Sequence, residues 1–363
     1  MNTKEKIASI LNSSLHADNE MEFISGEELA KRCNVSRAAV HKAICALREE
    51  GFCIEAVTNK GYSLKSFPDR LDSSLIEDLV AQRIGQANNF SSKAVQVFAF
   101  KEIDSTNLEA KRRTADKELH RVVFAAEKQT AGRGRLGRVF VSPADSGVYF
   151  SLVYRPAGGV KNPAFLTAAA AVAVSRAVKQ LYNWECKIKW VNDVFLEGKK
   201  ISGILTEGVA NFETGTIDSA IVGIGINVRN CGFEGKLAEV AGSIEEIIAE
   251  NMDKQKKSSE NLPKVSRNQL VAVVVSELLN IYDSYFCGDK KEVKNAMDEY
   301  RARSLLTGME VFVNPVAGLE GKVYRAKVLD VTDEAELLVQ TEDGTTKKLF
   351  SGEVSLKSEN FAG

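Results

Sequence analysis

Histidine is almost absent from this chain, and its cysteines are not spaced for metal binding. Only three histidines, His16, His41 and His120, occur among 363 residues, and none is combined with cysteines in a metal-ligand arrangement. The six cysteines include no C-x-x-C pair. The sequence therefore predicts no metal site, and it offers little histidine for acid–base catalysis. Scattered thiols of this kind are typical of a reduced, cytoplasmic protein.

The chain also lacks a strong excess of either charge. Its net charge is −1, with 48 basic and 49 acidic residues. Bulk charge therefore excludes a general polyanion binder, and any contact with nucleic acid has to come from a local patch. No signal peptide opens the sequence and no apolar run looks long enough to span a bilayer, so we expect no membrane partner.

What the chain does have is a segment rich in glycine and arginine at residues 129–138. It contains three glycines and three arginines, and no acidic residue occurs between Lys128 and Asp145. Glycine lets the backbone bend and approach a ligand closely, and arginine offers forked donors that suit phosphate or carboxylate. The segment therefore predicts a loop that binds an anion.

The same glycines match two nucleotide-binding patterns, and the context rejects both. Gly132, Gly134 and Gly137 have the G-x-G-x-x-G spacing of a dinucleotide fingerprint, and Val139 completes a kinase-type glycine loop. A Rossmann loop opens a helix, whereas the residues after this loop, 138–143, are typical of a strand. The other kinase motifs do not occur in the sequence.

Residues 1–66 are expected to form a winged helix-turn-helix domain. Apolar spacing predicts three helices, of which the second begins at a capping box over residues 25–28 and the third at Ser36. Val40, Ile44 and Leu47 give the third helix one buried stripe. Residues 53–57 and 61–64 are typical of a hairpin, which would be the wing.

The charge of this domain is balanced overall but segregated along the chain. Residues 1–66 hold nine basic and nine acidic side chains, yet residues 31–48 hold five basic and no acidic ones. This asymmetry favours DNA binding over the alternative of a solvated face in a generic three-helix module. The residues expected to contact DNA are Ser36, Arg37, His41, Lys42 and Lys60.

The rest of the chain divides into a central region, residues 67–303, and an all-β tail, residues 304–363. Strands are expected at residues 95–100, 121–126, 148–155, 186–190, 201–207 and 219–228, and helices at 73–84, 163–184 and 267–286. So few helices between successive strands indicate an α+β domain and not a doubly wound sheet. The short strands of the tail predict a small barrel.

Other segments of the central region carry polar or small residues. Residues 104–107 cluster hydroxyl and amide groups that can fix a small ligand, although the same residues could begin a helix. Lys187 and Lys189 share one strand face, a pattern that also occurs at solvated edges. Glycines inside the strands at 199–205 and 223–227 indicate close approach by a ligand or by another backbone.

In this order and spacing, the motifs resemble those of the biotin protein ligases. The segments DSTN, QTAGRGRLGR, KWVNDV, KISGIL and GIGINV are similar to that family's ligase motifs. SRAAVHKAICALREEG followed by NKGYSL resembles the DNA-binding domain of the bifunctional members, which also repress the biotin operon. The resemblance covers essentially the whole chain. It implies a biotin/lipoyl-ligase-like catalytic domain with a mixed sheet and an SH3-like C-terminal barrel.

The resemblance implies a two-step ligation and a regulatory role for its intermediate. Biotin and Mg-ATP would form biotinyl-5′-AMP, and biotin would then pass to a lysine of the biotin carboxyl carrier protein of acetyl-CoA carboxylase. Because the biotin carboxylate is already ionised at pH 7, this chemistry needs charge neutralisation and alignment more than a general base. The adenylate would also act as corepressor by promoting a homodimer that binds operator DNA.

The resemblance also assigns roles to individual residues. The catalytic residues would be Lys189, Arg133 and Arg135. The biotin-binding residues would be Ser105, Thr106, Asn107, Gln129, Arg133, Gly134, Arg135, Lys189 and Gly203. The nucleotide-binding residues would be Arg135, Arg138, Phe140, Asn192 and Asn227.

Two positions depart from the family pattern. Val191 stands where the family usually has proline, and Phe140 where an aromatic near the adenine is often tryptophan. Both are expected to affect ligand affinity and not activity. Val191 loosens the backbone but leaves Lys189, Asn192 and Asp193 in place, and the phenyl ring of Phe140 still stacks, with less area.

Three other functions remain to be weighed. One is a biotin ligase whose N-terminal module has lost DNA binding, and the charge asymmetry at residues 31–48 disfavours it. Another is a transcription factor that binds a ligand without turnover, which has no reason to keep Lys189 together with Arg133 and Arg135. An octanoyl or lipoyl ligase of related fold is disfavoured by the winged module and by GRGRLGR.

Overall fold

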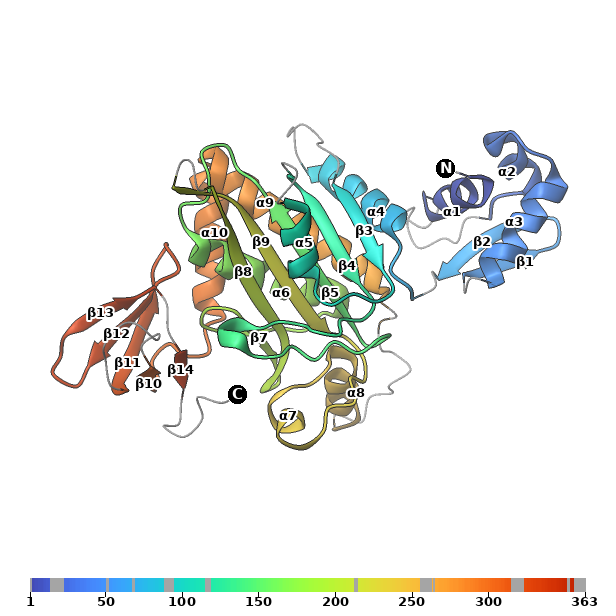
Figure 1. The fold of residues 1–363 in the computed structure, drawn as a ribbon. Coiled ribbons are helices and arrows are strands. Elements are labelled where there is room, and N and C mark those ends of the chain that lie inside the picture. The colour runs from blue at the N-terminus through green and yellow to red at the C-terminus, as the bar shows by residue number, and fades with distance from the viewer. Residues whose placement is uncertain are drawn as a thin grey trace.

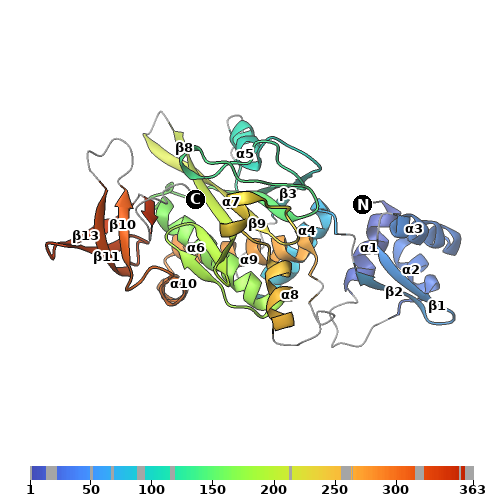
Figure 2. The same ribbon diagram turned by 90° about the horizontal axis from the view of Figure 1, so that it is seen from below.

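In the computed structural model, the chain forms three parts in a row (Figures 1 and 2). A helical module at the N-terminal end and a small sheet at the C-terminal end lie on opposite sides of a central mixed sheet. The structure describes residues 2–13, 23–49, 52–66, 69–87, 95–114, 119–211, 215–254, 263, 265–314, 323–350 and 353–355. This is the multidomain α+β architecture that the sequence predicts.

The N-terminal module is the predicted winged helix-turn-helix. Its elements are α1 (Thr3–Ser13), α2 (Gly26–Cys33), α3 (Arg37–Glu49), β1 (Cys53–Val57) and β2 (Gly61–Ser66), the last two antiparallel. Ser25 caps α2 by accepting a hydrogen bond from the Glu28 amide. Asn34 then ends α2 in the left-handed conformation and turns the chain toward α3. Ile7 and Ile44 are among the side chains buried between the helices.

The central domain is built on a seven-stranded mixed sheet of order β3-β4-β5-β9-β8-β7-β6. Its strands are β3 (Gln96–Phe100), β4 (Val122–Ala126), β5 (Gly147–Tyr154), β6 (Lys187–Lys189), β7 (Asp193–Leu196), β8 (Lys199–Asn211) and β9 (Thr216–Asn227). β3 and β4 are parallel, and every other neighbouring pair is antiparallel. The mixed sheet expected from the family resemblance is therefore confirmed.

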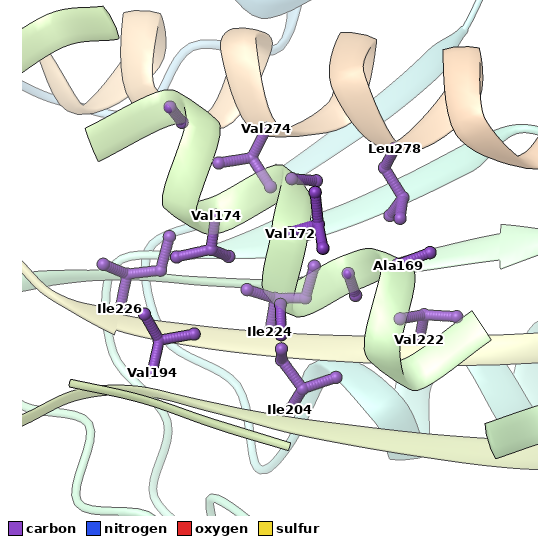
Figure 3. Close-up of a cluster of buried hydrophobic side chains, with 14 of the residues drawn as sticks. Ala169, Val172, Val174, Val194, Ile204, Val222, Ile224, Ile226, Val274 and Leu278 are labelled. Atoms are coloured by element: carbon purple, nitrogen blue, oxygen red, sulfur yellow. The ribbon is translucent and has the colours of Figure 1, made fainter. Parts of the chain in front are cut away.

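Helices α4 (Ser73–Ala87), α6 (Pro163–Tyr182) and α9 (Arg267–Cys287) cover one face of this sheet. Figure 3 shows α6 lying between β9 and α9, with Val222, Ile224 and Ile226 of β9 in the packed cluster. Much of the buried surface of α6 is alanine. Small side chains let helix and sheet approach closely, so the three layers form one continuous core.

The opposite face of the sheet carries α5 (Thr106–Thr114), which packs on β4, β5 and β9. Beneath α5, Ala110, Phe124 and Ile221 belong to a small apolar cluster separate from the main core. α7 (Gly235–Val240) and α8 (Ile244–Lys254) follow the end of β9. Side chains of α5 also bond to β8, so the helix lies over the middle of this face.

The C-terminal domain is a five-stranded antiparallel sheet of order β13-β12-β11-β10-β14, reached through α10 (Lys290–Ala302). Its strands are β10 (Glu310–Asn314), β11 (Tyr324–Val331), β12 (Leu337–Thr341), β13 (Thr346–Leu349) and β14 (Glu353–Ser355). The Trp190 indole donates a hydrogen bond of 2.9 Å to the carbonyl of Ala335, in the turn before β12. This contact ties the small sheet to the segment that follows β6.

Several elements were not predicted from the sequence: α7, α8, α10, β7 and β14. For α5, only a possible helix start at residues 104–107 was noted. The buried face of α5 includes the polar residues Thr106 and Asn107, so it shows no apolar stripe. α8 does have such a stripe, in Ile244, Ile247 and Ile248, and this signal could have been used. The sequence predicts a linker at residues 66–70 and a polar, charge-rich loop at residues 253–264. Both lie partly outside the described residues.

The expectation that no apolar run is long enough to span a bilayer is wrong, because two helices are long and apolar enough to do so. α6 and α9 both pass that test, but 72% and 67% of their most apolar windows are buried inside the fold. They are the core helices that cover the central sheet.

The position of Ile224 gives a test of this core. Ile224→Ala should lower the free energy of unfolding by about 2–5 kcal/mol, because it removes buried methyl groups and leaves a cavity. Chemical denaturation measures the change. Val139→Ala, at a side chain that is 78% exposed, is the control and should stay within about 0.5 kcal/mol. Equal losses in both variants would contradict the assignment of Ile224 to the core.

Candidate active site

Because side chains alternate along β9, two glycines lie on the face of the sheet that carries α5, and the isoleucine between them lies in the core. Gly223 and Gly225 face α5, whereas Ile224 between them is buried against α6. Gly225 pairs directly with Gly203 of β8. A Cβ atom added at Gly225 would lie 2.4 Å from the Phe140 ring, and one added at Gly203 would lie 3.1 Å from it. The paired glycines therefore form a floor, and the aromatic ring now rests on it.

The polar cluster at the start of α5 forms one wall of this site. Ser105, Thr106 and Asn107 are each at most 4% exposed. The Gln129 side-chain oxygen accepts hydrogen bonds from the Thr106 amide at 2.9 Å and from its hydroxyl at 3.2 Å. The Ser151 hydroxyl lies 2.8 Å from Thr106 Oγ1 and 2.6 Å from Asn107 Oδ1. The cluster is thus both a helix start and a set of buried polar groups beside the floor.

Glu207 of β8 is a carboxylate of this wall that the sequence analysis missed. Its Oε2 accepts from Asn107 Nδ2 at 2.8 Å, and its Oε1 lies 2.6 Å from Lys111 Nζ and 3.7 Å from Arg133 Nη1. Burial raises the pKa of Glu207, but the bonds from Lys111 and Asn107 outweigh burial and hold the pKa below its usual value. Glu207 therefore stays ionised and holds the Asn107 side chain in place. A Cβ atom added at Gly223 would lie 2.2 Å from the amide oxygen of Asn107.

The Gly–Arg loop, residues 129–142, is an ordered hairpin. Gln129 donates to the Ser142 carbonyl at 3.1 Å, and Phe140 donates to the Gly132 carbonyl at 3.0 Å. A short 3-10 turn, Arg135–Gly137, lies at its tip. The loop does not open an α-helix, as expected, but residues 138–142 make isolated bridges and not the continuous strand that was predicted.

The three glycines of this loop meet different constraints. Gly137 has a φ of +74°, in the left-handed region that favours glycine. A Cβ atom at Gly132 would lie 2.3 Å from the carbonyl oxygen of Phe140. Gly134 has a φ of −113°, and a Cβ atom there would meet nothing closer than 3.5 Å. Contacts within the fold therefore do not require glycine at position 134, and close approach by a ligand remains as a reason for it.

The segment after β6 forms the facing wall. Lys189 is half-buried on the same strand face as the exposed Lys187, and Ile188 is buried on the other, which is the predicted alternation. Asn192 donates to the Ile204 carbonyl at 3.0 Å. The Asn192 side-chain oxygen accepts from Arg135 Nη1 at 3.2 Å, so this hydrogen bond joins the loop tip to the wall.

Lys200 is a further cation at the floor that the sequence analysis passed over. Its ammonium lies 2.7 Å from Asp193 Oδ1, and a Cβ atom at Gly203 would lie 3.4 Å from it. The signal was available, because Lys200 opens the KISGIL segment that was noted only for its glycine.

The structure separates the residues expected to bind the nucleotide. Phe140 lies over the glycine floor, and Asn227 follows at the end of β9, where its side chain donates to the Gly242 carbonyl at 3.1 Å. Arg138 is on the exposed side of the loop. The Arg138 amide donates to the Arg135 carbonyl at 3.2 Å within the loop, and the Arg135 guanidinium donates to Asn192 across the site.

The residues expected to contact DNA are exposed on the N-terminal module: Arg37, His41 and Lys42 on α3, Lys60 in the turn of the wing, and Ser36, which caps α3. Two other basic residues of the stretch 31–48 already bond to groups within the module. Arg32 pairs with Glu28 at 2.7 Å, and Arg48 donates to the Ile54 carbonyl at 3.0 Å. The basic surface is therefore narrower than the sequence stretch 31–48 suggests.

Sequence families match three consecutive parts of the chain. They are an HTH domain at residues 18–63, the biotin/lipoate A/B protein ligase family at 97–227 and the biotin protein ligase C terminal domain at 315–357. The bifunctional ligase/repressor BirA of Bacillus subtilis is 32% identical over 338 residues, which cover 92% of this chain and 94% of that protein. The chain belongs to the biotin protein ligase family.

Two further members extend this comparison. The bifunctional ligase/repressor BirA of Escherichia coli is 28% identical over 93% of this chain and 94% of that protein. The structure of the biotin protein ligase from Aquifex aeolicus in complex with biotin and ATP is similar, with a TM-score of 0.56 and 26% identity. That match covers 71% of this chain and 97% of the Aquifex chain. The resemblance inferred from the motifs is confirmed.

The floor itself can be tested by substitution. Gly223→Ala should lower the free energy of unfolding by about 1–3 kcal/mol, because the new methyl group displaces Asn107 from its buried hydrogen bonds. Thermal or chemical denaturation measures the loss. Gly134→Ala is the matched control and should leave stability unchanged within about 0.5 kcal/mol, since nothing in the fold crowds that position. Tolerance of Ala at position 223 would argue against the contact with Asn107.

Proposed function

We propose that the chain is a biotin–[acetyl-CoA-carboxylase] ligase and a repressor of the biotin operon. It forms biotinyl-5′-AMP from biotin and ATP, and it transfers biotin to a lysine of the biotin carboxyl carrier protein. The adenylate is also the corepressor. The observation that carries this proposal is the pair of facing glycines, Gly203 and Gly225, bordered by Lys189 and the arginine loop, in a chain that begins with a winged helix.

Biotin fits the floor and the α5 wall. The ring system has flat apolar faces and one polar ureido edge, so it suits bare backbone below and buried amide and hydroxyl groups beside it. Ser105, Thr106, Asn107 and Gln129 supply those groups. The Phe140 ring, which now rests over Gly203 and Gly225, leaves the floor when biotin binds and stacks on the adenine.

Adenylation needs little proton transfer at this site. An oxygen of the ionised biotin carboxylate attacks the α-phosphorus of ATP, the bond to the bridging oxygen breaks, and pyrophosphate leaves. Lys189 bridges the carboxylate and the α-phosphate, while Arg133 and Arg135 neutralise the acyl phosphate and the triphosphate. Asn192, Asn227 and Arg138 hold the nucleotide. The residues present are cations and amides, which match this demand.

Magnesium accompanies ATP as part of the substrate. Among the described residues, no group of three His, Cys, Asp or Glu side chains could hold a metal ion. Asp193, beside the floor, is already paired with Lys200. Oxygen atoms of the triphosphate and water suit magnesium better, and there the ion neutralises phosphate charge.

Transfer to the carrier protein needs the adenylate to survive until the acceptor arrives. The amine of the acceptor lysine attacks the acyl carbon, AMP leaves with the bonding electrons, and the amine loses a proton to solvent. Closure of the Gly–Arg loop excludes water, which would otherwise hydrolyse the mixed anhydride. Gly134 allows the loop backbone to approach the adenylate.

The repressor half of the proposal rests on the N-terminal module. α3 lies in the major groove, with Arg37, His41 and Lys42 toward the DNA, and the wing carries Lys60 to the backbone. Binding of the adenylate favours a homodimer, which presents two such modules to a two-fold operator. The protein acts in the cytoplasm and needs no membrane partner. The alternative is a ligase whose module no longer binds DNA.

The same proposal divides the chain into three domains. The DNA-binding domain comprises residues 1–66, the catalytic domain 67–303 and the SH3-like domain 304–363. The sheet orders support this division, because each range holds a separate sheet.

The role of Lys189 is tested by comparison with its neighbour on the same strand face. Lys189→Ala should slow biotin-dependent pyrophosphate exchange about 100-fold or more, because it removes a cation aimed at the reacting groups. Lys187→Ala is the matched control and should retain exchange. Full activity of Lys189→Ala, with the fold unchanged by circular dichroism, would refute the assignment.

The exposed basic residues of α3 give a test of DNA binding. Arg37→Ala and Lys42→Ala should weaken DNA binding, and each should reduce the salt slope of log K by about 0.9 for every phosphate that the removed cation neutralises. Lys4→Ala, on α1, is the control. If Arg37→Ala and Lys42→Ala both retain the wild-type affinity and slope, these two residues do not contact DNA. Absence of DNA binding by the wild-type protein loaded with the adenylate would favour the alternative without DNA function.

A further inference from the structure

Arg267, at the start of α9, is a fully buried charge that joins distant parts of the chain. Its side chain is 0% exposed. Its guanidinium lies 2.9 Å from the Asp69 carboxylate and 2.7 Å from that of Glu127, and it donates to the Gly147 carbonyl at 3.2 Å. A buried charge is tolerated only when such partners stay in place. These contacts therefore fix the relative positions of the segments that supply them.

One of these segments leads from the DNA-binding module into the catalytic domain. Asp69 lies three residues after Ser66, the last residue of the wing strand. Leu71 donates to Glu127 at 2.5 Å, and Asn268 donates to the Arg70 carbonyl at 2.7 Å. Residues 69–72 are thus held on α9 and do not form a loose linker.

Two other segments are the roots of the Gly–Arg loop. Glu127 follows β4 and stands two residues before Gln129, where the loop begins. Gly147 opens β5, five residues after Ser142, where the loop ends. Arg267 therefore contacts both ends of the loop that closes over the adenylate, together with the entry segment.

Arg229 makes a second connection from the same carboxylate. It pairs with Asp69 on one side and lies 3.2 Å from Glu245 of α8 on the other. It lies two residues after Asn227, the residue at the nucleotide end of β9. Its amide also donates to the Ser146 carbonyl, at the loop exit, at 2.7 Å. Asp69 is thus shared by two arginines that reach different borders of the site.

The packing beside this network leaves room for displacement. A surface cleft of about 580 Å³ lies at this junction, and its lining includes the buried Glu127 and the exposed residues Arg70, Lys101, Ala144 and Asp145. Because the entry segment and both loop roots border the cleft, a shift of the loop is not blocked here by close packing.

We propose that Asp69 couples the adenylate site to the DNA-binding module through Arg229 and Arg267. This inference rests on the proposed function and adds a route for its regulation. Closure of the loop moves the two arginines, because Arg267 contacts the residues that flank the loop and Arg229 bonds to Ser146 at the loop exit. Their shared carboxylate passes the displacement to residues 69–72. The coupling is reciprocal, so DNA that favours one position of the module also tightens adenylate binding.

Arg229 is the better residue for a test. Arg267 is wholly buried, and its loss would leave carboxylates without a partner in the core. Arg229 is 36% exposed, so Arg229→Gln removes the charge that joins Asp69 to Glu245 with less risk to folding. The matched control is Arg155→Gln. Arg155 pairs with Asp218 at 3.1 Å and is 30% exposed, outside the network.

The experiment measures adenylation and DNA binding on the same full-length protein. Duplexes are selected from a random-sequence DNA pool by the wild-type protein loaded with biotinyl-5′-AMP. Their affinity is then measured by fluorescence anisotropy with and without the adenylate, and pyrophosphate exchange is measured in parallel. The wild-type affinity ratio should lie in the usual range of allosteric couplings, about 5- to 150-fold. For Arg229→Gln the ratio should fall close to one while exchange is retained, and Arg155→Gln should behave as wild type.

Any other outcome overturns the inference, and the affinity ratio and the exchange rate together show which part of it fails. A wild-type ratio in Arg229→Gln removes the coupling role and leaves the proposed function intact. Loss of exchange in Arg229→Gln would mean that Arg229 serves the site itself. A wild-type ratio of one overturns both the coupling and the corepressor proposal, while exchange still reports on ligation.

Asp69→Asn provides an independent check, because it removes the shared charge and keeps a side-chain acceptor. Its affinity ratio should fall in the same direction. Combined with Arg229→Gln it should add little, since both changes break one connection. Full additivity of the two effects would show that the residues act separately, and it would overturn the shared route.

Discussion

The register of β8 against β9 is the constraint on which the central domain depends. Side chains of a strand alternate between its faces, so a strand with glycine at every second position can be core on one side and ligand floor on the other. Gly223 and Gly225 lie on one face of β9, and Ile224 lies on the other. A slip of one residue would bring isoleucine into the site and leave glycine in the core. The packing of β9 on the alanine-rich α6 (Figure 3) and the shape of the site are therefore set together.

Charged side chains that are removed from water are the second constraint on the central domain. Glu207 stays ionised because Lys111 and Asn107 bond to it, and this fixes the α5 wall against the floor. Arg267 is satisfied by carboxylates and backbone carbonyls from distant segments, and this fixes where the chain enters the catalytic domain. In both cases the cost of burying the charge is offset by partners that must be arranged around it in one particular geometry. Such groups therefore act as positional constraints on the apolar core.

The elements that the sequence predicted well are those whose burial follows a regular period. The winged module, α6, α9 and most strands of the sheet belong to this class. For α5, only a possible helix start at residues 104–107 was predicted. The helix itself was not, because its buried face carries Thr106 and Asn107 and therefore shows no apolar stripe. Most expected site residues border one floor in the structure, but their roles stay predictions. Glu207 and Lys200 were overlooked because their significance comes from partners on other elements, α5 for Glu207 and β7 for Lys200.

The sequence by itself determined the local features: the helix and strand periods, the anion-binding composition of the Gly–Arg loop, the basic surface of α3 and the family. These follow from residues close together in the chain, where spacing translates directly into geometry. Only the tertiary structure decided which distant groups meet. The contact between Arg267 and Asp69 joins residues 198 positions apart, and no local pattern encodes it. The reason is physical: a charge finds its partner through the packing of whole elements, and that packing exists only in the folded chain.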